Sequence, residues 1–133
     1  KEAVEMATLC LNDDRLDFLD MSLWDVFKEP VDEAFAGNSL LELFAGLERG
    51  EVKLGVAGKI GTPQLADEAM NHGIDWVMLG RAAILQHDFP NRYAADAGFI
   101  PVPLPVTRDY LVHEGLSVKF IDYMATWPGF VEG

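Results

Sequence analysis

The chain has 133 residues, half of them hydrophobic and 24% charged, which is ordinary for a soluble globular protein with one core. Its net charge of −12 disfavours nucleic acid and anionic membrane surfaces as partners, because both attract basic proteins. No apolar run approaches the ~20 residues of a membrane helix, and no secretory leader is visible. We therefore expect a soluble, cytoplasmic protein with no membrane partner. Cys10, the only cysteine, excludes an internal disulfide and a thiolate-only metal site, and we expect it to be buried.

Helical and extended patterns alternate in the first half of the chain. Residues 2–11 carry apolar side chains at the spacing of one helical face, and residues 16–22 (LDFLDMS) form the first expected strand. A long connection containing Pro30 follows. Ser39 is then placed to cap a helix, which Gly50 is expected to end.

Two further strands follow, separated by one more helix. Residues 52–57 (VKLGVA) and 74–79 (IDWVML) are short apolar runs typical of buried strands. Between them, Thr62 and Pro63 begin a helix that should end near Gly73. Strands joined by crossover helices must be parallel, with right-handed connections. The predicted fold class is therefore α/β.

The end of the chain has a different character. Three prolines within residues 99–105 exclude a regular helix there, whereas Thr107 and Ser117 are each placed to cap a short one. Large apolar side chains then gather near the end: Phe120, Tyr123, Met124, Trp127 and Phe130. Exposed clusters of this kind usually mark contacts. We therefore expect residues 98–133 to be an extension that packs on the domain 1–97 or on a neighbouring subunit of a homo-oligomer.

A glycine and then a cationic residue follow each of the last two expected strands. These pairs are Gly58-Lys59 and Gly80-Arg81. Glycine lets a backbone approach a ligand closely, and amides at a helix start donate to an anion. A guanidinium adds a forked partner for phosphate oxygens. The pattern indicates a phosphate site, although strand-end glycines are more commonly plain turns and loop lysines are usually solvated. The glycine motifs of dinucleotide-binding folds and P-loops are absent from the sequence.

The stretch VKLGVAGKIGTPQLADEAMNHGIDWVMLGRAAILQHDFPNR resembles strand 7 to helix 8 of the old yellow enzyme family of FMN-dependent NAD(P)H oxidoreductases. Its most specific part is the Gly-Arg after the last strand, followed by a small-apolar helix and by HDFPNR. Upstream, LDFLDMS resembles the sixth strand of that family. The resemblance spans about residues 1–92 and implies strands 6 to 8 of a (β/α)8 barrel, or TIM barrel, which typically needs ~250 residues. The chain is therefore expected to be one part of a longer polypeptide.

The resemblance also implies cofactor-binding residues. Gly58, Lys59 and Gly80 would approach the FMN phosphate through backbone amides, and Arg81 would contact it through its side chain. Members of the family reduce activated alkenes and related electrophilic small molecules, with NAD(P)H as electron donor. Their substrate-binding histidine pair lies upstream of this chain, so we expect no catalytic residue here and no activity from these residues alone.

Other polar and aromatic residues have simpler interpretations. His72, His87 and His113 do not match the family's histidine pair and are expected at the surface or at helix ends. Trp24, just after the first strand, either borders the flavin or substrate or packs the connection that follows. Two other functions stay open: another phosphate-binding TIM barrel enzyme, such as a phosphosugar isomerase or a nucleotide dehydrogenase, and a non-catalytic α/β interaction fragment.

Overall fold

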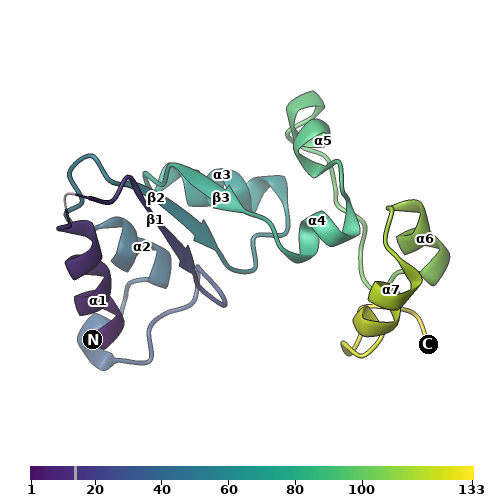
Figure 1. Ribbon diagram of the computed structural model, residues 1–133, viewed down its shortest axis with the longest axis horizontal. Coiled ribbons are helices and arrows are strands. Elements are labelled where there is room, and N and C mark those ends of the chain that lie inside the picture. Colours follow the sequence, from purple (N-terminus) through teal and green to yellow (C-terminus); the bar gives the residue numbers. More distant parts are fainter. Residues whose placement is uncertain (14) are drawn as a thin grey trace. The chain divides into compact units, whose positions relative to one another are not determined.

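The computed structural model describes residues 1–13 and 15–133, which form two compact units (Figure 1). The first unit comprises residues 1–60 and 64–79, and the second comprises residues 61–63 and 80–133. The protein is of mixed α/β class, as predicted, with one small parallel sheet in the first unit. The expected boundary between residues 97 and 98 falls inside the second unit.

Three parallel strands form the sheet, in the order β1-β2-β3. β1 (Phe18–Ser22) pairs along its whole length with β2 (Lys53–Ala57), and β3 (Trp76–Met78) pairs with the last three residues of β2. The strands point the same way (Figure 1), so their carboxyl ends lie at one edge of the sheet. All three strands and their direction were predicted. Each strand is shorter than expected, because the ladder exists only where a partner strand lies alongside.

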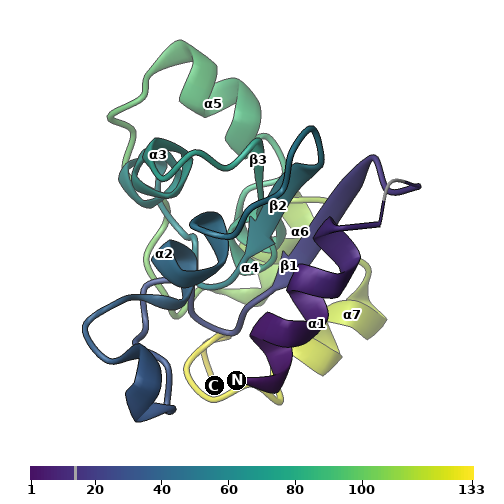
Figure 2. The same ribbon diagram turned by 90° about the vertical axis from the view of Figure 1, so that its left-hand side faces the viewer.

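Helices α1 (Glu2–Leu11), α2 (Leu40–Ala45) and α3 (Pro63–Asn71) accompany these strands, and η1 (Glu33–Phe35) is a short 3-10 turn in the long connection after β1. Figure 2 shows α1 and α2 beside the strands of the sheet. α3 belongs to the first unit from residue 64 onward. The three helices predicted in this part of the chain are present, although α2 is shorter than expected.

A capping box begins α2. The Ser39 hydroxyl accepts a hydrogen bond from the Glu42 amide at 3.1 Å, and the Glu42 carboxylate accepts one from the Ser39 amide at 2.7 Å. The helix ends at Ala45 with Gly46 as its cap, four residues before the predicted stop. Gly50 does take the left-handed conformation expected of it, with φ of +53°, but in the turn that leads into β2.

One face of the sheet packs against the helices, and the other does not. Alternate strand residues on the packed face, such as Leu54 and Val56, are fully buried. They share a single core with Met21 of β1 and with residues of all three helices: Ala7, Leu41, Phe44, Ala66 and Ala69. On the opposite face Phe18 is 57% exposed, and its ring packs edge-on against Trp76. The second face is therefore exposed along β1, whereas Gly55 of β2 is buried there beside the Trp76 ring.

The second unit contains four short helices: α4 (Arg81–Leu85), α5 (Phe89–Ala95), α6 (Arg108–His113) and α7 (Val118–Met124). The hydroxyls of Thr107 and Ser117 accept hydrogen bonds from amides in the first turns of α6 and α7, as predicted. Residues 99–105 form neither helix nor strand, in agreement with their prolines.

The tail builds a core of its own within the second unit. The buried members of this core are Leu85, Val106, Leu111, Ile121, Met124 and Phe130. Trp127 contacts Tyr123 and Phe130 edge-to-face, at centroid distances of 5.8 and 5.7 Å. Tyr123 nevertheless stays 54% exposed. Much of the apolar area that suggested docking is thus used inside the unit, and contact with a second subunit stays a prediction.

Within residues 1–13 and 15–133, no helix combines the length and the apolar character that crossing a bilayer requires.

Asp75 fastens the amino end of β3 to β2. Its carboxylate accepts hydrogen bonds from the Leu54 amide at 2.8 Å and from Arg49 at 3.1 Å, and Lys53 lies 3.3 Å away. In return the Asp75 amide donates to the Leu54 carbonyl. The Leu54 amide, followed by Lys53 and Arg49, holds the pKa of Asp75 below its ordinary value.

Replacing Asp75 with asparagine should therefore lower thermal stability in a pH-dependent way. Because the pKa of Asp75 is depressed in the folded state, its contribution is present above the unfolded value and is lost as pH falls through the folded one. The loss in Tm should be clear at about pH 7 and should shrink toward about pH 2.5 in thermal scans. Glu68→Gln, at an exposed carboxylate on α3, controls for the change in net charge. An equal loss at both pH values would contradict this assignment.

Candidate functional site

Gly58 lies at the carboxyl end of β2, where the predicted phosphate site begins. Its φ is +152°, and a Cβ added there would lie 1.8 Å from the carbonyl oxygen of Leu23. The connection after β1 therefore passes directly over the end of β2. Glycine is required at this position by that close approach alone, whether or not a ligand also uses it.

Lys59 follows with a left-handed backbone, φ +52°, which is uncommon for a residue with a side chain. Its ammonium lies 3.0 Å from the Asp25 carboxylate, and the two side chains are 47% and 23% exposed. The hydrogen bond from Lys59 lowers the pKa of Asp25, which is thus ionised at neutral pH. Because Asp25 neutralises the ammonium, the Lys59 amide is the group left for an anion. Sequence spacing alone did not reveal Asp25 as its partner.

Two backbone hydrogen bonds hold the connection between β1 and α2 against the end of β2. The Leu23 amide donates to the Ala57 carbonyl at 2.7 Å, and the Val26 amide donates to the Gly58 carbonyl at 3.3 Å. The Asp25 carboxylate also accepts from the Phe27 amide at 3.2 Å. The first of these bonds belongs to the Ser22–Ala57 pairing, with which the β1–β2 ladder ends. This edge of the sheet is consequently well ordered by its own backbone.

Gly80 and Arg81 belong to the second unit, where they begin α4. A Cβ added at Gly80 would meet no atom within 4 Å, so its backbone is open to approach. Arg81 is exposed, and within the described part of the chain its guanidinium has no ion-pair partner. Gly80 follows Met78 by two residues, and Met78 pairs with Ala57 of β2. The chain thus leaves β3 at the same edge of the sheet as it leaves β2.

The histidines occupy the positions expected of them. His72 and His113 are exposed, and His87 is exposed in the turn before α5. His87 approaches Glu114 with its backbone amide at 3.0 Å and with Nδ1 at 2.7 Å. Burial raises the pKa of Glu114, but the hydrogen bonds from His87 outweigh that effect and lower it overall. This contact ties α5 to the end of α6 inside the second unit.

Asp88 lies beside this pair, close enough for its carboxylate to share an ion with His87 and Glu114. However, Arg92 already donates to Asp88 at 2.8 Å, one turn along α5. A cation is therefore supplied by the chain itself, and the group acts as a local ionic network.

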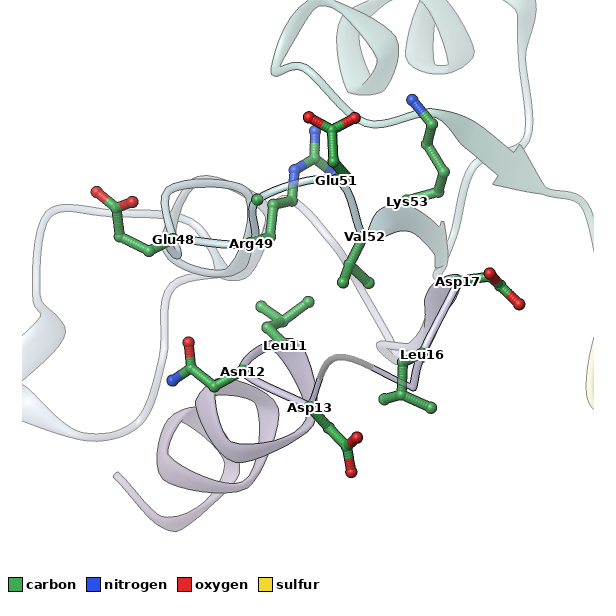
Figure 3. Close-up of a pocket in the computed structure, with 11 residues that line it drawn as sticks. Leu11, Asn12, Asp13, Leu16, Asp17, Glu48, Arg49, Glu51, Val52 and Lys53 are labelled. Carbon is green, nitrogen blue, oxygen red and sulfur yellow. The ribbon is translucent and has the colours of Figure 1, made fainter.

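A hollow of about 820 Å3 opens at the amino end of the sheet (Figure 3). Leu11 and Val52 lie near its middle, with charged side chains around them. The other lining residues are Asn12, Asp13, Leu16, Asp17, Glu48, Arg49, Gly50, Glu51 and Lys53. None of the predicted site residues is among them.

Chemically, the carboxyl edge offers anion recognition. In the first unit its polar groups are backbone amides and the neutralised Lys59–Asp25 pair, and in the second unit the Arg81 guanidinium is exposed at the start of α4. None of the protein-family models, curated proteins or solved structures compared with the chain matches it. The assignment of a function therefore depends on the sequence and on this geometry.

Proposed function

We propose that the chain is strands 6 to 8 of an FMN-binding (β/α)8 barrel, with a C-terminal extension, from an NAD(P)H oxidoreductase like the old yellow enzymes. The observation that carries the proposal is the one-sided sheet. Its strands follow one another in sequence order, and all three helices share one core on one face. A barrel wall has this arrangement, with helices outside and strand side chains filling the interior. Doubly wound folds instead reverse their strand order and carry helices on both faces.

Arg81 is the cation proposed to bind the FMN phosphate. It is exposed, and it follows Gly80 at the start of the helix after the third strand. Barrels commonly bind phosphate with the loops after strands 7 and 8, which correspond here to the loops after β2 and β3. The proposed role of Lys59 is through its amide, because Asp25 already neutralises its ammonium. Gly58 and Gly80 are proposed to contribute backbone amides in the same way.

The chemistry that FMN supplies in such enzymes is hydride transfer from NAD(P)H to an electron-poor carbon of a small acceptor. The residues described here would bind the cofactor and form part of the barrel wall. The groups that polarise the acceptor are proposed to lie in the remainder of the barrel. This chain alone is therefore expected to be inactive.

The test is to purify the full-length protein and to release its bound cofactor by denaturation. The expected result is about one FMN per chain, and NADH or NADPH consumption that depends on an activated enone such as 2-cyclohexenone. Apoprotein that fails to take up FMN, while showing isomerase activity on a phosphosugar, would favour the other phosphate-binding barrel. Protein without flavin or any such turnover would favour the interaction fragment.

A further inference from the structure

Helix α4, which begins at Arg81, is too short to fix its own position. It spans five residues, and isolated helices of fewer than about 12–15 residues are only marginally stable in water. Its N-cap residue is Gly80, which has no side chain to cap the helix. The position of α4 must therefore come from contacts with other parts of the second unit.

Two side chains of the tail, residues 98–133, hold the carboxyl end of α4. The Tyr110 hydroxyl donates to the carbonyl of Leu85, the last residue of α4, at 2.7 Å. The Glu114 carboxylate accepts from the His87 amide at 3.0 Å and lies 2.7 Å from Nδ1 of the same histidine. Because the Glu114 side chain is only 9% exposed, water competes little for these bonds. The tail therefore holds the backbone on both sides of residue 86.

Gln86, between these two contacts, is held by the tail as well. It is 1% exposed, and its side-chain oxygen accepts from the Val102 amide at 3.2 Å. Leu85 lies in the core of the second unit with Leu111 and Ile121 of the tail. Moving a buried, hydrogen-bonded polar group is costly, because its partner is left unsatisfied. Three successive residues at the end of α4 are thus fixed by the tail.

Arg81 lies one helical turn before this fixed end, at a rise of about 6 Å from Leu85. A single turn moves as one body, so a displacement of its carboxyl end displaces Arg81 too. Phosphate recognition by a guanidinium depends on the placement of its forked donors. We infer that Tyr110, Gln86 and Glu114 are positioning residues, through which the tail places Arg81 for the FMN phosphate. This inference rests on the proposed function and gives the tail a part in cofactor binding.

The experiment compares two ligands of the full-length apoprotein: FMN, and riboflavin, which has the same ring system without the phosphate. Tyr110→Phe removes only the hydroxyl, and it should weaken FMN binding about fivefold while leaving riboflavin binding unchanged. Glu114→Ala should act in the same way. Glu114→Gln should recover most of that loss, because its side-chain oxygen can still accept from the His87 amide. Thr126→Val is the matched control, because it removes a hydroxyl that donates within the tail, to the Tyr123 carbonyl.

A double-mutant cycle shows whether the effect passes through Arg81. In the Arg81→Ala background, Tyr110→Phe should cause no further loss of FMN affinity, because no guanidinium is left to place. A loss of the same size in both backgrounds would overturn the inference, as would unchanged FMN affinity in Tyr110→Phe and Glu114→Ala. Equal losses for FMN and riboflavin, with a lower Tm, would show that the tail only stabilises the fold. Wild-type protein that binds neither ligand would instead refute the proposed function itself, and this inference with it.

Discussion

Replacing Arg81 with alanine in the full-length protein is expected to weaken FMN binding about ten- to a hundredfold. A charge-assisted hydrogen bond contributes ~1.5–3 kcal/mol, which corresponds to that range of affinity. Arg81 follows β3 and is exposed. Within the described part of the chain no carboxylate neutralises it, whereas Asp25 neutralises Lys59. Titrating apoprotein with FMN and following flavin fluorescence would give the two dissociation constants.

Lys59→Ala is the comparison that sharpens this result. The ammonium of Lys59 is engaged by Asp25, and its backbone amide survives the substitution. Its effect on FMN affinity should therefore be much smaller than that of Arg81→Ala. Arg81→Lys should fall between the two, because it keeps the charge and loses the forked geometry. Equal FMN affinity in the wild type and in Arg81→Ala would rule out the phosphate assignment.

Replacing Gly58 with alanine is expected to destabilise the protein by about 3 kcal/mol or more. The new methyl group would lie 1.8 Å from the Leu23 carbonyl oxygen, and the backbone would keep a φ that side chains rarely adopt. Relief requires the connection after β1 to move away from β2. The hydrogen bonds that fix this connection would be lost with that movement. Urea unfolding of wild type and variant measures the difference.

Gly50→Ala separates the two causes. Gly50 also has a positive φ, +53°, but a Cβ there meets no atom within 4 Å. Gly50→Ala should therefore lower the free energy of unfolding by about 1 kcal/mol, through conformational strain alone. A similar loss for both variants would mean that the contact with Leu23 is unimportant, and that backbone conformation explains the requirement for glycine at position 58.

Local sequence signals predicted most of the elements. The apolar spacing of α1, the Ser39 cap of α2 and the hydroxyl caps of α6 and α7 all act within a few residues, so a single sequence contains them. The end of α2 was placed too late. Gly46 and Gly50 were both available as stops, and the choice depended on how the chain turns back toward β2.

The contacts that organise the candidate site are not local. Asp25 and Lys59 are far apart in sequence, and nothing in their spacing distinguishes a partner from a solvated carboxylate. The same holds for Gly58 and Leu23, because steric demand on a glycine depends on a backbone that arrives from elsewhere. The prediction that Cys10 is buried was wrong, because residue type alone does not determine burial and Cys10 is only half-buried. Residue type suggested where the site lies, and tertiary structure determined which groups remain free in it.

The parallel ladder has a consequence for how the protein folds. Phe18 pairs with Lys53, and Gly55 pairs with Trp76. Each pair of neighbouring strands is therefore separated in the sequence by a long connection that contains a helix. Each pairing must wait for a complete crossover, and closing these loops costs entropy before any hydrogen bond between strands is gained. Folding of the first unit should therefore be slow for its size, as in other proteins of high contact order. During that interval β1 has no partner, and encounters between chains compete with correct assembly.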